Sequence, residues 1–207
     1  SGQQAVLGPD ARISVITCGP GTDLYAQFGH SAFRVQDPAR GLDWIYNYGT
    51  FDFDTPNFYM KFARGKLRYA LSRTDFANFL YTYQLEGRWV SEQLLDLNPG
   101  QKTALFEYLE RNNRRENRYY QYDFLAENCA TKIPDVLREV LGPGLDMVSG
   151  FSGDGRTYRE LIQQNLQVNS WSSLGIDLAL GAVVDRKASP LGYSFLPEYV
   201  RQLVGDA

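Results

Sequence analysis

Short segments in which polar and apolar residues alternate occupy the first half of the chain. Alternation with a period of two is typical of strands that bury one face. The segment 12–18 ends at a Gly-Pro-Gly turn, and the segments 30–35 and 43–48 are separated only by the loop 37–41. Two strands joined by so short a loop pair antiparallel, because a parallel pair needs a long crossover. Further strands are expected at 67–71, within 88–97 and at 119–122.

Helical patterns dominate the second half. Asn98-Pro99 opens one helix, and in 129–141 the apolar residues recur at i, i+3, i+4, i+7 and i+8, which is typical of an amphipathic helix. Shorter helices are expected at 51–62 (after an irregular start), 157–164, 171–180 and 196–204. Strands packed with helices, without an internal repeat or a long linker, predict one α+β domain over residues 1–207, built on an antiparallel sheet.

Composition and charge narrow the class of protein. Hydrophobic residues make up 43% and aromatic residues 14%, which is enough for a substantial core. With 21 Lys and Arg against 24 Asp and Glu, the net charge of −3 argues against a nucleic-acid partner. No run of 18 apolar residues occurs, and the first residues lack a leader pattern. The chain is expected to be either cytosolic or a mature exported segment.

The chain has one histidine, His30, and two cysteines, Cys18 and Cys129. Any Cys–His pair must therefore use His30. Cys129 follows Asn128, and if Asn128 caps the helix, the free N–H groups of the first turn favour a thiolate and supply an oxyanion donor. Pro134 removes a helical N–H, which moves the expected helix start toward Thr131 and weakens this part of the prediction.

The hairpin predicts a partner for the imidazole. A loop centred at 39–40 places Ala32 opposite Asn47 and His30 opposite Gly49. His30 and Asn47 then project from the same face on neighbouring strands, where the amide can fix the tautomer of the imidazole. A slip of one residue would give this role to Tyr46 or Tyr48 instead.

Simpler interpretations of the same residues remain open. Cys18 and Cys129 are candidates for a structural disulfide in an exported protein. A zinc site made of His30, Cys18 and Cys129 is disfavoured because no pair has metal-ligand spacing. Neither a metal nor another cofactor is expected.

Three segments carry a family resemblance: 28–35 (FGHSAFRV), 46–51 (YNYGTF) and 122–133 (YDFLAENCATKI). They resemble the N-terminal periplasmic domain of the Lnb-type bacterial lipoprotein N-acyltransferases. The segments 17–21 and 171–177 also fit the pattern, so the resemblance covers about residues 11–203. It implies the circularly permuted papain-like fold of NlpC/P60 peptidases and lecithin:retinol acyltransferases.

The resemblance implies roles for individual residues. Cys129 is expected to be the nucleophile, His30 the base and Asn47 the residue that orients it. Tyr48, Asn128 and Ser31, which belong to the same motifs, are expected to contact the substrate.

The implied reaction is a cysteine-dependent acyl transfer in the periplasm. Cys129 would take a fatty acyl group from a lipid donor as a thioester and pass it to the N-terminal amine of a lipoprotein. The expected setting is a membrane surface, with the signal peptide removed and the domain belonging to a membrane-anchored protein. Two alternatives stand: a cell-wall peptidase or amidase, or a lipid hydrolase, with the same Cys–His pair, and a non-catalytic binding module with a Cys18–Cys129 bridge.

Overall fold

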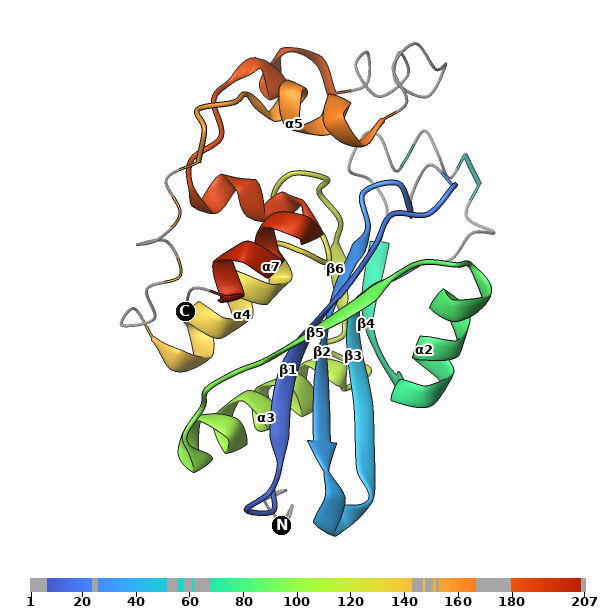
Figure 1. Cartoon of the computed structure of the whole chain (residues 1–207), viewed down its shortest axis with the longest axis vertical. Coiled ribbons are helices and arrows are strands. Elements are labelled where there is room, and N and C mark those ends of the chain that lie inside the picture. Colours follow the sequence, from blue (N-terminus) through green and yellow to red (C-terminus); the bar gives the residue numbers. More distant parts are fainter. Residues whose placement is uncertain are drawn as a thin grey trace.

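The computed structural model describes residues 7–23, 26–51, 56–57, 61, 68–142, 147, 151, 153–166 and 180–205. Six strands form one sheet in the order β5-β1-β2-β3-β4-β6, and every neighbouring pair is antiparallel (Figure 1). This confirms the predicted antiparallel sheet. The strands are β1 (Arg12–Cys18), β2 (His30–Asp37), β3 (Leu42–Thr50), β4 (Arg68–Asp75), β5 (Val90–Leu94) and β6 (Tyr119–Gln121).

Helices cover both faces of the sheet, so the α+β class is confirmed as well. The α-helices are α2 (Phe76–Leu85), α3 (Pro99–Asn113), α4 (Lys132–Leu141), α5 (Tyr158–Asn165) and α7 (Pro197–Gly205). Short 3-10 helices are η2 (Pro38–Arg40), η3 (Gly181–Asp185) and η4 (Leu191–Phe195). Within the described ranges, no helix combines the length and the apolar content needed to cross a bilayer.

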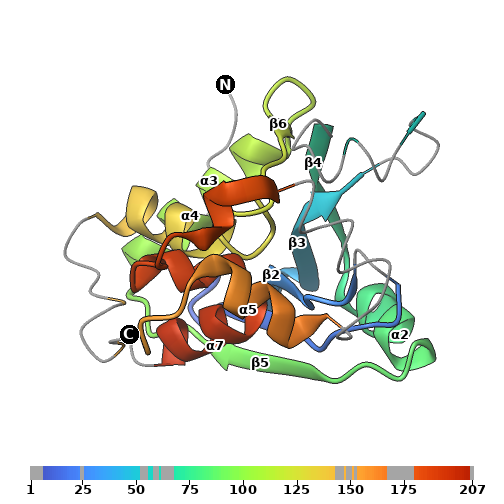
Figure 2. The same cartoon turned by 90° about the horizontal axis from the view of Figure 1, so that it is seen from above.

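Strand alternation divides the core between the two faces. Ile13, Val15 and Phe33 point to one face and pack against α3, α4 and α7. Ile16 and Ala32, which alternate with them, point to the other face and pack against α2. A third cluster, rich in aromatic side chains, joins β4 and β6 to α5 and η4. Figure 2 shows α5 and α7 on the same side of the molecule, away from α2.

The β2–β3 hairpin has the predicted register. Phe33 lies opposite Tyr46 and Val35 opposite Trp44, and the same register continued places Ala32 opposite Asn47. The turn is η2, which closes at Gly41 in the left-handed region with φ of 63°. A one-residue slip is therefore excluded. His30 and Asn47 share the face covered by α2.

Most predicted helices are confirmed. α3 begins with a capping box in which Asn98 accepts from Gln101 N–H and Gln101 returns the contact, and α5 and α7 correspond to 157–164 and 196–204. α2 was not predicted, because its aromatic residues have weak helix propensity and Asp75 makes no capping hydrogen bond. Most of 51–62, and 171–180 except its last residue, lie outside the described residues.

Candidate active site

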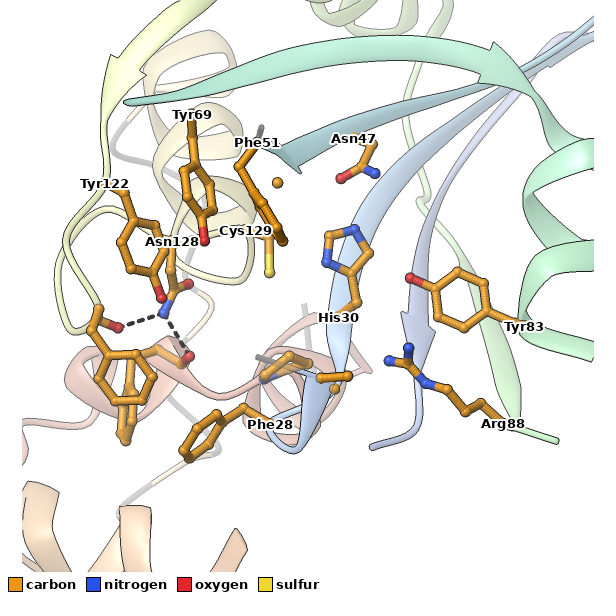
Figure 3. Close-up of a pocket in the computed structure, with 16 residues that line it drawn as sticks. Phe28, His30, Asn47, Phe51, Tyr69, Tyr83, Arg88, Tyr122, Asn128 and Cys129 are labelled. Carbon is orange, nitrogen blue, oxygen red and sulfur yellow. Dashed lines mark hydrogen bonds between the residues drawn. The ribbon is translucent and has the colours of Figure 1, made fainter. Parts of the chain in front are cut away.

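A pocket with a cavity volume of about 160 Å³ brings together the three predicted catalytic residues, Cys129, His30 and Asn47 (Figure 3). His30 is the first residue of β2, Asn47 lies on β3, and Cys129 lies in the turn before α4. Residues about a hundred positions apart in the chain thus meet at one end of the sheet.

Two glycines allow the close approach around His30. Gly29 has φ of 81°, and a Cβ there would lie 2.6 Å from the carbonyl oxygen of Cys18. A Cβ on Gly49 would lie 2.8 Å from His30 Cε1, 3.1 Å from Asn47 Oδ1 and 3.5 Å from Cys129 Cβ. All three side chains therefore surround the bare Cα of Gly49, which leaves the space that they share.

The imidazole lies between its two expected partners. In Figure 3 one ring nitrogen is turned toward Cys129 and the other toward Asn47. Asn47 acts as a weak hydrogen-bond partner that raises the pKa of His30. Neither His30 Nε2 nor Asn47 Oδ1, both buried, has a partner with full hydrogen-bond geometry in the described part of the chain. Catalytic hydrogen bonds are often this loose before substrate binds.

Asn128 organises the turn that carries Cys129. Its Oδ1 accepts from the N–H groups of Ala130 at 2.8 Å and Thr131 at 2.9 Å, and its Nδ2 donates to the carbonyl oxygens of Phe124 and Phe195. The regular helix α4 begins three residues after Cys129, with Thr131 as its N-cap. Asn128 thus caps the turn before the helix, and the later helix start that Pro134 predicts is also confirmed.

Backbone amides surround the Cys129 sulfur. Burial raises the pKa of the thiol to about 11, whereas the N–H groups of Ser31, Cys129 and Ala130 and the charge of Arg88 lower it. The same N–H groups stabilise a thiolate once it forms.

The imidazole is neutral at physiological pH. Burial lowers the pKa of His30 to about 4; Asn47 opposes this shift and Arg88 adds to it. With the thiol pKa raised and the imidazole pKa lowered, the site holds a neutral thiol beside a neutral base. A neutral imidazole that faces a thiol is able to accept its proton during attack.

The walls of the pocket differ in character. Tyr69 stacks on Tyr122 at 4.2 Å between ring centroids, and Phe28 contacts Phe124 edge-on at 4.9 Å. These rings, with Phe51 and Phe195, form an aromatic wall on one side of Cys129. Tyr83 and Arg88 line the opposite side, next to His30 (Figure 3). Tyr83 and Arg88 were not among the predicted site residues, because they belong to the unpredicted helix α2 and the turn that follows it.

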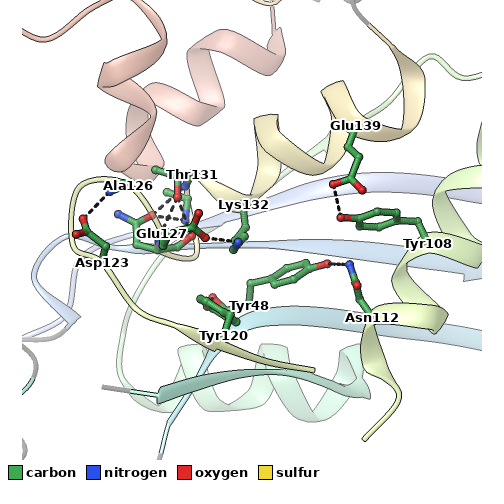
Figure 4. Close-up of polar contacts among 12 residues, drawn as sticks. Tyr48, Tyr108, Asn112, Tyr120, Asp123, Ala126, Glu127, Thr131, Lys132 and Glu139 are labelled. Atoms are coloured by element: carbon green, nitrogen blue, oxygen red, sulfur yellow. Dashed lines mark hydrogen bonds and ion pairs between the residues drawn. The ribbon is translucent and has the colours of Figure 1, made fainter. Parts of the chain in front are cut away.

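Two residues expected to contact substrate lie elsewhere. Tyr48 points to the opposite face of the sheet, where its hydroxyl accepts from Asn112 Nδ2 at 3.0 Å (Figure 4). Ser31 is fully buried and approaches Cys129 through its backbone N–H. Asn128 lines the pocket, but its amide is engaged in the four hydrogen bonds above. These positions do not support direct substrate contacts by Tyr48 or by the Ser31 side chain.

The second cysteine is not bonded to the first. Both Cys18 and Cys129 are free thiols, which contradicts the disulfide on which the binding-module alternative depends. Cys18 is sealed in the core opposite His30, and burial raises its pKa to about 12. Among the described residues, no three His, Cys, Asp or Glu side chains are grouped as metal ligands.

The fold and pocket define a class: an α+β domain with a thiol, an imidazole and an amide aligned in an aromatic-lined pocket. The chain belongs to the Lnb N-terminal periplasmic domain family, whose model matches residues 3–164. The predicted resemblance and the periplasmic location are thereby confirmed. The segment 171–177 lies beyond the match and outside the described residues.

Family membership associates the chain with lipoprotein modification. Comparison with curated proteins gives no match, and comparison with solved structures gives none either.

Proposed function

We propose that this domain is a cysteine acyltransferase that moves a fatty acyl group from a lipid ester, through a thioester on Cys129, to the N-terminal amine of a lipoprotein. His30 is the base in this proposal and Asn47 orients it. The partners are a lipid acyl donor and a lipoprotein acceptor, met at a membrane surface. The proposal also assigns the domain to the circularly permuted papain-like fold, because the strand that begins with His30 precedes the turn that carries Asn128 and Cys129 in the chain.

The reaction has two steps. Cys129 Sγ attacks the ester carbonyl while its proton passes to His30, and the oxyanion is held by the Cys129 N–H. The carbon–oxygen bond then breaks, the leaving alcohol takes the proton from His30, and the thioester remains. In the second step the amine attacks the thioester, His30 takes the amine proton and returns it to the Cys129 sulfur, and the amide leaves.

One observation carries the proposal: Cys129, His30 and Asn47 converge on the bare Cα of Gly49 inside an open pocket. A structural cysteine has no need of a base turned toward it or of backbone amides around its sulfur. Cys18 is an example of such a structural cysteine, because it is buried in the core.

The aromatic wall favours an acyl donor over a peptide. Phe28, Phe51, Phe124 and Phe195 offer hydrocarbon surface in the same pocket as the sulfur, where an alkyl chain is stabilised by leaving water. A cavity of about 160 Å³ holds the reacting ester and the first part of a chain rather than a complete fatty acyl group.

The test is formation of the thioester. The protein is incubated with a lipid ester in detergent micelles, and the mass of the intact protein and of its Cys129 peptide is measured. The wild type is expected to gain one acyl mass, which hydroxylamine removes. Cys129→Ser and His30→Ala should gain no such thioester, whereas Cys18→Ser, the matched control at the other thiol, should retain it. Acylation that persists in both site variants would contradict the mechanism.

The products of the same experiment identify the acyl acceptor. A diacyl lipopeptide with a free N-terminus should discharge the thioester and appear with an amide-linked acyl chain. Release of free fatty acid alone would indicate a lipid hydrolase. Cleavage of muropeptides, without any thioester from lipid, would indicate the cell-wall peptidase or amidase.

A further inference from the structure

We propose that Arg88 is the substrate-recognition residue of this pocket and that it binds the phosphate of a glycerophospholipid acyl donor. This inference rests on the proposed function, because the lipid is an acyl donor only if the domain transfers acyl groups. The binding of a phosphate group beside Cys129 is tested independently of any acyl transfer.

The backbone fixes the position of Arg88. Helix α2 ends at Leu85 and is followed by Gly87, which has φ of 63°. Gly87 N–H is bonded to Gln84 O, and Arg88 N–H is bonded to Tyr83 O. This pair of hydrogen bonds is the Schellman helix end, which requires a residue such as glycine that tolerates the left-handed region. The chain then turns into β5 and leaves Arg88 against the pocket.

The guanidinium is held through two of its nitrogens and open at the third. Nε donates to Gly19 O at 2.8 Å, Nη1 contacts Glu86 at 2.9 Å, and the group lies 4.5 Å from the Tyr83 ring centroid. The side chain is only 8% exposed. Nη2 makes no hydrogen bond to the described residues and is not sealed from solvent, and Figure 3 shows the terminal nitrogens turned to the pocket.

Charge makes the Nη2 end of Arg88 an anion site. Among the described residues that line the pocket, Arg88 is the one Lys or Arg, and no Asp or Glu accompanies it. Glu86 binds Nη1 from outside the pocket lining and neutralises part of the charge. A held guanidinium that keeps Nη2 free to donate is suited to phosphate, because a hydrogen bond between two ions is stronger than one between neutral groups.

The arrangement of the pocket explains why the anion should be a lipid phosphate. The aromatic wall lies on one side of Cys129, and Arg88 lies beyond His30 on the other (Figure 3). A glycerophospholipid has the same order of groups: alkyl chain, ester carbonyl, glycerol and phosphate. With its ester at the sulfur and its chain on the aromatic wall, such a lipid directs its phosphate toward Arg88.

The first experiment uses charge-matched thiol reagents. Iodoacetate and iodoacetamide alkylate the same sulfur and differ by one negative charge. Peptide mass spectrometry measures the alkylation of Cys129 separately from that of Cys18. Arg88→Gln should lower the iodoacetate-to-iodoacetamide rate ratio at Cys129 by roughly tenfold. Using the ratio removes any change in thiol pKa, which affects both reagents equally. Arg34→Gln is the matched control, because Arg34 is also ion-paired, with a side chain 12% exposed, and does not line the pocket.

Protection of Cys129 from alkylation distinguishes specific phosphate binding from a nonspecific effect of the positive charge of Arg88. Glycerol 3-phosphate should slow alkylation of wild-type Cys129 by iodoacetamide in a saturable manner, and glycerol should not. Arg88→Gln should abolish this protection. Glu86→Gln, which leaves the guanidinium and its Gly19 contact in place, should strengthen it, so the proposal stays testable even if Arg88→Gln fails to fold. An unchanged ratio in Arg88→Gln, or unchanged protection in Glu86→Gln, would overturn phosphate binding.

A third experiment compares two lipids, with and without a phosphate, as acyl donors. Phosphatidylglycerol and a diacylglycerol with the same chains are offered in neutral detergent, and the thioester on Cys129 is timed. Wild type should prefer the phospholipid, and Arg88→Gln should remove the preference by slowing that arm alone. Equal slowing of both arms would overturn the proposal and assign Arg88 to maintenance of the site. Failure of thioester formation from either lipid would count against the proposed function and leave the alkylation result standing.

Discussion

At the scale of single residues, the site depends on a glycine that carries no functional group. Gly49 is surrounded by the imidazole of His30, the amide of Asn47 and the Cβ of Cys129. The separation between these side chains is set by the absence of a Cβ between them. A residue that performs no chemistry therefore controls the geometry of the residues that would.

Gly49→Ala should reduce activity far more than stability. The added methyl would approach His30 Cε1 to 2.8 Å, so the ring must move, while the backbone needs no left-handed conformation. We expect thioester formation to fall by at least about a hundredfold, as small misplacements of a reacting group do. Thermal unfolding should shift by only a few degrees.

Gly41→Ala is the control for that substitution. Gly41 lies in the β2–β3 turn with open space around a Cβ and a left-handed φ of 63°, so its replacement strains the turn and leaves the pocket intact. It should lower stability without changing the rate of thioester formation by the folded protein. Full activity in Gly49→Ala would contradict the geometry described for the site.

The thiol of Cys129 should behave as a neutral group. Because burial raises the pKa of Cys129 to about 11, iodoacetamide alkylation should increase with pH up to about 10 and show no plateau at low pH. A thiolate–imidazolium pair would instead give a plateau below neutral pH. The measurement is the alkylation rate of the Cys129 peptide from pH 5 to 10, and a low-pH plateau would refute the neutral pair.

At the scale of elements, Asn128 connects the Cys129 turn to two other parts of the fold. It caps the turn before α4, reaches the 123–127 loop through Phe124 O, and reaches η4 through Phe195 O. The side chain is 6% exposed, so none of these bonds is readily replaced by water. Asn128, the motif residue next to the proposed nucleophile, is in this arrangement a positioning residue.

Asn128→Ala should therefore cost both stability and thiol reactivity. Removing this buried amide removes four hydrogen bonds at once, for which we expect a loss of about 2–4 kcal/mol in the free energy of unfolding by urea. Cys129 alkylation should slow as the turn loses its cap. Asn98→Ala, at the exposed cap of α3, should cost about 1 kcal/mol and leave Cys129 unaffected.

Local patterns in the sequence were sufficient for most elements and for the hairpin register. The five residues 37–41 allow one close pairing of 30–35 with 43–48, and that pairing places His30 and Asn47 on one face. α2 was missed because tertiary packing, with Phe79 against Ile16 and Ala32, stabilises it where propensity does not. Arg88 was missed for the same reason, since only α2 and its glycine end direct it to the pocket.

At the scale of the whole molecule, the pocket lies where separate clusters of the core meet. The aromatic wall belongs to the cluster that includes α5 and η4, and Cys18 and Tyr83 belong to the cluster under α2. His30 therefore lies among well-packed groups on all sides except the pocket itself. This setting links the protonation of one side chain to the stability of the entire domain.

Stability should decline as the pH falls from about 6.5 to about 4. Burial lowers the pKa of His30 to about 4 in the folded chain. Between pH 6.5 and about 4 the unfolded chain therefore binds a proton at His30 that the folded chain does not bind. The free energy of unfolding then decreases with falling pH through this window. Urea denaturation at half-unit pH steps measures it, and His30→Gln isolates the effect, because the chain has one histidine. The two curves should converge toward low pH, and parallel curves from pH 7 to 4 would mean that His30 remains easily protonated in the folded domain.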